Sequence, residues 1–301
     1  MAITEKLFEE VVLKLAHLSA IELPSSVLAK LKEKADKETN PMAKKQFEAI
    51  FENCKIATEK RVSLCQDNGL PQMFIDFGQK CRMEGNFEAA AQRAYALATK
   101  QIPLRENAIH PLSYHNPGTN VGPNMPSMQW RPIVDADYLE VTVIPKGNGG
   151  EMHDTHSWVL TSEEIKPAVI RSVLDCVADM MGEPCPPVII GIGLGGQFDV
   201  NSILAKRALF RDPIGAPSPD PLAAELEKDV LDAVNSLKLG PMGFGGETYA
   251  VACHIELASA HTAIVPITVA FQCWAHRFSK ARIYDDGRVE YLTHPNANKV
   301  S

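Results

Sequence analysis

The sequence Cys65-Gln-Asp-Asn-Gly69 divides the chain into two parts with different patterns. Before it, apolar residues recur at helical spacing, and after it short strand patterns alternate with helices and glycine-rich turns. This order predicts a mixed α+β fold, in which a helical N-terminal part over residues 1–60 precedes a mixed sheet region with helices over residues 61–301. Because the sequence has no internal repeat and no low-complexity linker, we expect residues 1–301 to form one compact domain.

Local signals predict where some elements begin and turn. Asn86 is a typical helix N-cap, and the alanine-rich sequence after it predicts a helix over residues 86–100. Asp286-Gly287 predicts the turn of a β-hairpin over residues 283–291.

The composition excludes several classes of protein. A formal net charge of −7 argues against nucleic-acid binding, because proteins that bind phosphate backbones concentrate basic residues on one face. No uninterrupted apolar run approaches the roughly 20 residues that a membrane span needs, and the N-terminus lacks the pattern of a signal peptide. We therefore expect a cytoplasmic protein, in which a few local Arg and Lys side chains could still hold a small anionic substrate.

The seven cysteines are scattered, which suits neither a secreted disulfide framework nor a zinc ribbon. Cys65, Cys185 and Cys273 stand where motifs change the direction of the chain. Three thiolates suit an iron–sulfur cluster in which one iron lacks a protein ligand. Such an iron is a Lewis acid that can weaken a C–O bond without electron transfer, which indicates dehydration of a hydroxy acid. Of the other four cysteines, Cys54, Cys176 and Cys253 are expected in the core. Cys81 lies in a polar turn.

Two further segments carry candidate ligands. Residues 102–130 have no periodicity and are rich in Pro, Asn, Gly and His, which favours a functional loop with Arg105 as an anion ligand over a solvated connection. The two histidines and the aspartate of His153, Asp154 and His156 suggest a zinc site. However, they stand on a loop, and the spacing of a third ligand that is typical of zinc sites is missing. The role of these three residues stays open.

A second class of function, dinucleotide binding, is suggested by glycines after a buried-strand pattern. Gly191, Gly193 and Gly196 satisfy G-x-G-x-x-G, and Asp212 lies about as far on as the acid that binds a ribose. However, Asp212 follows a helix rather than ending a second strand. We interpret the glycines as a tight turn from strand to helix, whose helix N-terminus could receive a carboxylate.

Five ordered motifs together resemble the alpha subunit of the iron–sulfur hydro-lyases, the family of class I fumarases and L(+)-tartrate dehydratases. The resemblance covers essentially the whole chain. It implies a [4Fe–4S] cluster on Cys65, Cys185 and Cys273, and reversible addition of water across the double bond of a C4 dicarboxylate without a nicotinamide. The motifs are Cys65-Gln-Asp, Asn116-Pro-Gly-Thr-Asn120, Cys185-Pro-Pro through Gly196, Leu239 through Gly246, and His261 through Ala275.

Carried onto this sequence, the resemblance implies roles beside the cluster. Asp67 would transfer a proton to and from the leaving hydroxyl, and Gln66 would contact the substrate next to it. Arg105 would hold the remote carboxylate through its planar guanidinium. His261 would hydrogen-bond the substrate, and the backbone of the glycine turn at Gly149 would contact it. Two ordinary alternatives remain, since Arg105 could form a surface ion pair and His261 could be a satisfied core histidine.

Three departures from the family pattern matter. Asn68 replaces a usual Thr, which affects a hydrogen bond but removes no ligand, and residues 150–156 replace a usual Ser-Glu-Asn-Lys, which puts substrate contacts there in doubt. The chain also ends at Ser301, before the C-terminal domain that single-chain members use for the second proton transfer. We therefore expect a separately encoded beta subunit and a homodimer of this alpha chain.

The substrate is expected to be fumarate/(S)-malate, with L(+)-tartrate as the alternative. Outside this reaction, the alternatives are a dinucleotide-binding protein and a non-catalytic cluster-binding protein. The presence of Asp67, Arg105 and His261 argues against the latter.

Overall fold

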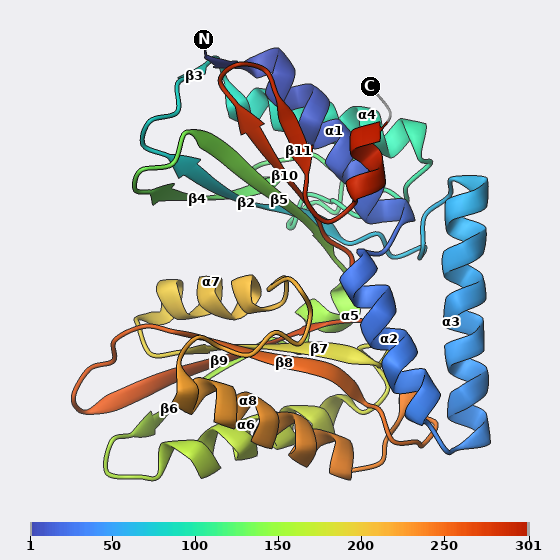
Figure 1. Cartoon of the computed structure of the whole chain (residues 1–301), viewed down its shortest axis with the longest axis vertical. Coiled ribbons are helices and arrows are strands. Elements are labelled where there is room, and N and C mark those ends of the chain that lie inside the picture. The colour runs from blue at the N-terminus through green and yellow to red at the C-terminus, as the bar shows by residue number, and fades with distance from the viewer. Residues whose placement is uncertain (1, 300–301) are drawn as a thin grey trace. The chain divides into compact units, whose positions relative to one another are not determined.

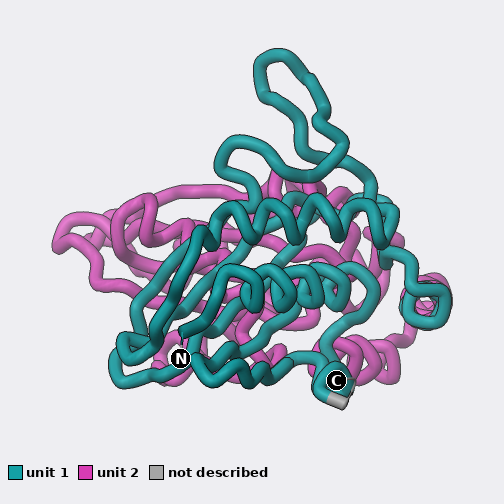
Figure 2. The backbone as a smooth tube through the Cα atoms, turned by 90° about the horizontal axis from the view of Figure 1, so that it is seen from above, with its two compact units in different colours: residues 1–25, 53–147, 277–301 teal, residues 26–52, 148–276 magenta. Residues whose placement is uncertain are grey.

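The computed structural model describes residues 2–299 and confirms the mixed α+β fold. The chain forms two compact units (Figure 2). Unit 1 comprises residues 1–25, 53–147 and 277–301, and unit 2 comprises residues 26–52 and 148–276. That the whole chain acts as one domain stays a prediction.

The expected helices of the N-terminal part form as α1 (Glu5–Ile21), α2 (Ser25–Lys37) and α3 (Pro41–Lys60). By length and apolar composition alone, the stretch Glu5–Lys37 could form a membrane-spanning helix, whereas the sequence predicts no membrane span. Over half of its most apolar window, 56%, is buried within the protein. Because core helices pass the same test, one such stretch is weak evidence for a membrane.

Unit 1 is built on a five-stranded sheet with the strand order β11-β10-β5-β2-β4. Helix α1 packs on this sheet and against α4 (Phe87–Gln101), as Figure 1 shows. Their contact is apolar, since Phe8 and Leu15 of α1 share one buried cluster with Ile75 and Val141 of the sheet. The strands of this sheet are β2 (Leu70–Gly78), β4 (Ser127–Ile133), β5 (Tyr138–Lys146), β10 (Ser279–Tyr284) and β11 (Val289–Tyr291). Unit 1 also contains a separate two-stranded parallel sheet, formed by β1 (Ile3–Thr4) and β3 (Met83–Glu84).

The local predictions in unit 1 are confirmed. The Asn86 side chain caps α4 by accepting the backbone N–H of Ala89 at 3.0 Å. Strands β10 and β11 pair antiparallel as the expected hairpin, with Gly287 in the left-handed region at φ +92°.

Unit 2 contains a four-stranded sheet with the order β6-β9-β7-β8. Helices α6 and α8 cover one face of this sheet and α7 covers the other (Figure 1). Strands β7 and β8 run parallel, while β9 runs antiparallel to both β7 and β6. Besides α2 and the first part of α3, the elements of unit 2 are α5 (Asn148–Glu151), β6 (Thr155–Leu160), α6 (Ile165–Met180), β7 (Val188–Leu194), α7 (Phe198–Ala208), α8 (Pro221–Ser236), η1 (Pro241–Gly243), β8 (Ala250–Leu257) and β9 (Ile264–Gln272). The short η2 (Pro295–Lys299) belongs to unit 1.

The four cysteines without an expected role differ in burial. Cys54 and Cys253 are buried, as predicted, and burial raises the pKa of the Cys54 thiol to about 11. Cys176 is half-buried on α6, where it packs against the core cluster of unit 2, and its Sγ lies 3.0 Å from the Thr155 hydroxyl.

Candidate active site

In unit 1, the Asp67 carboxylate is held by a local turn. Its Oδ1 accepts the backbone N–H of Gly69 at 3.0 Å and the side-chain amide of Asn107 at 3.3 Å. Gly69 has φ +72°, and a Cβ at this position would lie 2.4 Å from the Lys146 carbonyl oxygen. No other residue fits there without a shift of backbone, so the turn that orients Asp67 depends on glycine.

Gly147 brings a buried arginine to the same place. A Cβ on Gly147 would lie 3.0 Å from Asp67 Oδ2 and 3.4 Å from Arg277 Nη2. The Arg277 side chain is 1% exposed. A carboxylate and a guanidinium therefore flank one glycine, and sequence reasoning missed Arg277 because its four-residue separation from Cys273 is no signal of such a contact.

Gln66 and Arg105, both predicted to bind substrate, line one cavity of about 580 Å³ in unit 1. Both side chains are exposed, which leaves their amide and guanidinium groups accessible to a ligand in that cavity. The lining consists of Ser63, Gln66, Thr99, Lys100, Pro103, Leu104, Arg105, Glu106 and Gly118.

The Arg105 loop is positioned by Asn120, the last residue of the motif Asn116–Asn120. Asn120 is 1% exposed and lies in the left-handed region at φ +55°. Its side-chain amide donates to the Arg105 carbonyl at 3.0 Å, and its Oδ1 accepts the Asn107 N–H at 2.7 Å. The motif therefore includes a buried residue that fixes the loop carrying Arg105 and Asn107.

In unit 2, sheet pairing brings Cys185 and Cys273 to the same end of the sheet. Ile189 at the start of β7 pairs with Gln272 at the end of β9. The backbone N–H of Trp274 then donates to the Cys185 carbonyl at 3.0 Å. Cys185 itself has φ +55°, a left-handed conformation that is uncommon for a residue with a side chain and is concentrated at functional sites.

The second glycine-rich loop, residues 239–246, packs against the turn that carries Cys185. The Met242 N–H donates to the Pro186 carbonyl at 2.9 Å. A Cβ on Gly182 would lie 2.9 Å from the Met242 carbonyl oxygen, and one on Gly243 would lie 3.0 Å from the Gly182 Cα. These glycines permit two backbones to approach closely, a role that the sequence alone leaves undetermined.

His261 lies at the other end of the same sheet. It precedes the start of β9, whereas Cys273 follows the end of this nine-residue strand. At about 3.3 Å per residue, β9 separates the two positions by roughly 30 Å. His261 is exposed, and its Nδ1 accepts the Ala263 N–H at 3.1 Å. Within unit 2 the structure therefore does not bring His261 to the pair of cysteines.

Gly149, the backbone contact expected from the glycine turn, lies in α5. A Cβ on it would lie 3.0 Å from the Glu183 carbonyl oxygen, two residues before Cys185. Gly149 therefore packs closely against the Cys185 turn.

The glycines of the dinucleotide pattern pack β7 against α7. A Cβ on Gly191 would lie 2.3 Å from the Ala205 carbonyl oxygen, and one on Gly193 would lie 2.1 Å from that of Asn201. Asp212 accepts a hydrogen bond from the Ser26 hydroxyl at 2.5 Å. Close packing explains this motif without a nucleotide.

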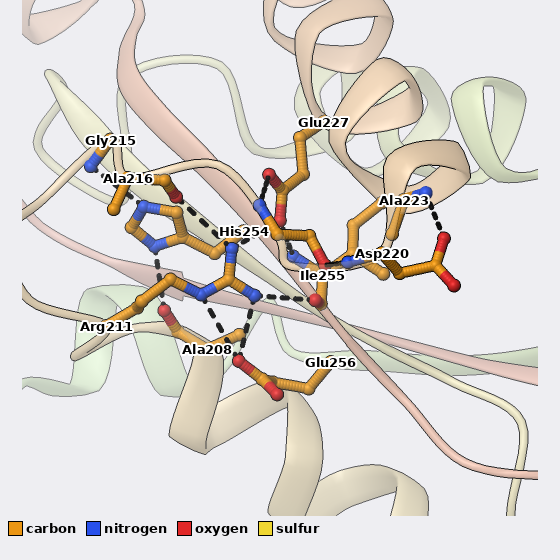
Figure 3. A network of polar contacts seen from close by, with 11 residues as sticks. Ala208, Arg211, Gly215, Ala216, Asp220, Ala223, Glu227, His254, Ile255 and Glu256 are labelled. Atoms are coloured by element: carbon orange, nitrogen blue, oxygen red, sulfur yellow. Dashed lines mark hydrogen bonds and ion pairs between the residues drawn. The ribbon is translucent and has the colours of Figure 1, made fainter.

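A polar network beside Asp212 ties the loop after α7 to β8 (Figure 3). The Arg211 guanidinium forms ion pairs with Glu227 at 2.5 Å and with Glu256 at 2.8 Å. His254 accepts the Gly215 N–H at Nε2 and contacts the Ala208 carbonyl through Nδ1, both at 2.9 Å. Burial lowers the pKa of His254 to about 4, so the ring is neutral and both nitrogens are satisfied.

Cysteine, histidine and carboxylate side chains are the donors that could hold a resident metal or cluster in this chain. Within the described residues 2–299, no three His, Cys, Asp or Glu side chains converge as a metal-binding group, and the role of His153, Asp154 and His156 stays open. Cys185 and Cys273 fit as two of three cluster ligands, because the backbone N–H of Trp274, the residue after Cys273, donates to the Cys185 carbonyl and thiolates are the usual ligands of iron–sulfur clusters. Cys65, the third, belongs to unit 1 and is half-buried.

Comparisons with known proteins identify the family of the chain. The model of the family "Fumarate hydratase (Fumerase)" matches residues 9–282. A Methanocaldococcus jannaschii protein, provisionally named L(+)-tartrate dehydratase subunit alpha, is 38% identical over 93% of this chain and 99% of its own length. The L(+)-tartrate dehydratase alpha subunits of Escherichia coli K12 and Shigella boydii are each 31% identical over 95% of this chain and 93% of their own length. The chain therefore belongs to the fumarate hydratase family of hydro-lyases.

Proposed function

We propose that the chain is the alpha subunit of a [4Fe–4S]-dependent hydro-lyase that reversibly adds water to a C4 dicarboxylate. The observation that carries this proposal is the hydrogen bond from Trp274 to the Cys185 carbonyl, which joins two of the three predicted cysteine segments. The names of the relatives, subunits of a dehydratase, support the same reaction.

Cys65, Cys185 and Cys273 would hold the cluster. When bound, a cluster with three protein thiolates supplies an iron that acts as a Lewis acid toward the hydroxyl and a carboxylate of the substrate.

The residues of unit 1 would bind and orient the substrate. The Arg105 guanidinium would form a bidentate ion pair with the remote carboxylate, and Gln66, on the same 580 Å³ cavity, would hydrogen-bond the substrate beside it. In unit 2, the backbone of α5 at Gly149 would contact the substrate as well.

Asp67 would carry the proton to and from the hydroxyl that leaves or adds. The donors Gly69 N–H and Asn107 Nδ2 hold its Oδ1 in one orientation, as a general acid or base requires.

The placement of His261 leads us to propose that it acts on the active site of a second copy. The length of β9 keeps His261 far from Cys185 and Cys273 of its own unit. In a homodimer of the alpha chain, the His261 of the second copy could reach them instead. This role depends on the expected homodimer.

We further propose that a separate beta subunit completes the enzyme, as the alpha names of the relatives suggest, and that the enzyme is cytoplasmic. Fumarate/(S)-malate is the proposed substrate pair. L(+)-tartrate is the second candidate, favoured by the names of relatives that are 31–38% identical.

The test is anaerobic reconstitution with iron and sulfide, followed by the visible spectrum and iron content. We expect a broad iron–sulfur band in the wild type that is lost in Cys65→Ala, Cys185→Ala and Cys273→Ala. Cys54→Ala is the matched control, because Cys54 is buried on α3 and belongs to none of the three motifs. A cluster that persists in all three cysteine variants would contradict the proposal. So would a wild type that takes up no cluster and binds NAD.

Turnover separates the substrates once the cluster is established. The reconstituted chain is combined with candidate beta subunits encoded by the same genome and assayed on (S)-malate and L(+)-tartrate. A higher kcat/KM for (S)-malate supports the proposed pair, whereas a higher value for tartrate selects the second candidate.

A further inference from the structure

The segment Met152–His156 has no role in the reaction proposed above, yet two of its side chains contact the cysteine-bearing segments of unit 2. It connects α5 to β6, and its backbone continues the turn of α5. The His153 N–H donates to the Gly150 carbonyl at 3.3 Å, and the Asp154 N–H donates to that of Glu151 at 3.2 Å. The adjacent side chains of His153 and Asp154 then bind different partners.

His153 binds the turn that carries Cys185. Its Nε2 lies 3.0 Å from Glu183 Oε2, and because a carboxylate accepts hydrogen bonds, Nε2 is the donor. Glu183 stands two residues before Cys185, and its carbonyl accepts the Cys185 Sγ–H at 3.8 Å. A Cβ added to Gly149 would lie 3.0 Å from the same carbonyl oxygen, so the backbone of α5 also packs close to Glu183.

Asp154 binds the strand that leads to Cys273. Its Oδ1 accepts the Phe271 N–H at 3.1 Å. The ladder between β6 and β9 begins at the pair Thr155 and Val269, so Phe271 lies beyond its last backbone pair. The Asp154 carboxylate therefore continues the pairing by one step and holds β9 two residues before Cys273.

These contacts form a brace across the two cysteine segments, which the hydrogen bond between Trp274 and Cys185 already joins. We propose that His153 and Asp154 are positioning residues that hold the Cys185 turn and the end of β9 in register, so that both thiolates are placed for an iron–sulfur cluster. This inference rests on the proposed function. Outer contacts of this kind orient metal ligands without touching the metal.

If His153 and Asp154 only stabilised the fold, their loss would lower the melting temperature of the cluster-free chain. The Glu183 side chain is 64% exposed, and exposed ion pairs contribute little to the free energy of unfolding. Loss of the brace should therefore change cluster retention far more than it changes the melting temperature of the cluster-free chain.

The first experiment compares cluster loss in the anaerobically reconstituted full chain after addition of an iron chelator. We expect His153→Ala and Asp154→Ala to lose the visible band about tenfold faster than the wild type, as removal of outer-shell partners does at metal sites. Asp154→Asn keeps an acceptor oxygen and His153→Gln keeps a donor, so both should approach the wild-type rate.

The matched control is His156→Gln. His156 belongs to the same segment, but its Nδ1 contacts the Thr268 hydroxyl at 2.9 Å, in the interior of β9. We expect the wild-type rate of cluster loss. Alanine variants that lose the band no faster than this control would overturn the proposal.

The second experiment uses the cluster-free chain, so it does not depend on the proposed function. Phenylarsine oxide condenses with two neighbouring thiols and releases one water, and peptide mapping identifies the bridged pair. We expect a bridge between Cys185 and Cys273 in the wild type and His156→Gln, and a severalfold lower yield in His153→Ala and Asp154→Ala.

The two experiments separate the two hypotheses. A brace-dependent arsenic bridge in a wild type that takes up no cluster would end the proposed function but leave the brace standing. A cluster on the three cysteines, with neither its loss rate nor the bridge altered by the alanine variants, would end the brace alone.

Discussion

The backbone N–H of Trp274 donates to the carbonyl of Cys185 at 3.0 Å, across 89 residues of sequence. This contact exists because β7 begins where β9 ends, as the pairing of Ile189 with Gln272 shows. The ends of two paired strands thus bring together the segments that carry Cys185 and Cys273.

Replacement of Asn120 by Ala should destabilise unit 1 and weaken substrate binding. The Asn107 N–H and the Arg105 carbonyl would lose their buried partner, at a cost of about 1–3 kcal/mol in the free energy of unfolding. Because the same loop carries Arg105, KM should rise as well. Urea denaturation and steady-state kinetics measure the two effects.

Asn124→Ala is the control for this prediction. Asn124 has φ +57°, close to the +55° of Asn120, but it is exposed. Both variants therefore place alanine in the left-handed region, and the difference between them isolates the hydrogen bonds. Equal losses of stability would mean that backbone strain, not the buried amide, explains the Asn120 variant.

Gly193→Ala should destabilise the protein strongly. Its new Cβ would lie 2.1 Å from the Asn201 carbonyl oxygen, so α7 must move away from β7. Overpacking of a core typically costs about 1–3 kcal/mol, and a clash with backbone stands at the upper end. The measurement is the midpoint of urea denaturation. Gly122→Ala, with nothing within 4 Å of its Cβ, is the control and should remain close to the wild type.

His254 should make the stability depend on pH between about 6.5 and 4. Burial lowers its pKa in the folded protein to about 4 from an ordinary 6.5. As pH falls through this window the unfolded chain takes up a proton that the folded protein refuses. The stabilisation is therefore complete above 6.5 and is lost as pH approaches 4, by about 3 kcal/mol in total.

The check on this pH dependence is chemical denaturation of wild type and His254→Gln at a series of pH values. The glutamine amide does not titrate, so the difference in free energy between the two should shrink as the solution is acidified. His110→Gln serves as the control, since His110 is exposed. A difference that stays constant from pH 7 to 4 would refute the assignment.

Local chemistry explains what could be predicted from the sequence. The cap at Asn86 and the turn at Gly287 depend on a few neighbouring residues, so both can be predicted from the sequence. Cys65, Cys185 and Cys273 stand out because each interrupts a pattern. The contacts that position them, such as Met242 with Pro186, join distant segments through sheet register and loop packing. No local pattern records such a pairing.

The same limit explains the residues that sequence reasoning left without a role. Asn107 and Arg277 are recognisable as site residues only once Asp67 and Gly147 lie beside them. The glycines at 191 and 193 matched a nucleotide fingerprint because close packing of a helix on a strand demands the same residue.

A mixed dimer tests whether His261 acts on a neighbouring active site. His261→Asn should raise KM about tenfold, the value of a hydrogen bond to a charged group, without changing the cluster spectrum, because His261 lies at the far end of β9 from Cys273. Asp67→Asn should lower kcat by at least about a hundredfold, as loss of a general acid or base does. The two variants are coexpressed with different affinity tags, and doubly tagged dimers are purified, reconstituted and combined with the beta subunit.

If His261 acts across the dimer, one active site of the hybrid carries both defects and the other carries none. The hybrid then regains activity with the KM of the wild type. If His261 acts on its own chain, each site keeps one defect and no site with wild-type kinetics appears. An unchanged KM in the His261→Asn homodimer would instead remove His261 from the substrate site altogether, and leave Arg105, Gln66 and the Gly149 backbone as the substrate ligands of the alpha chain.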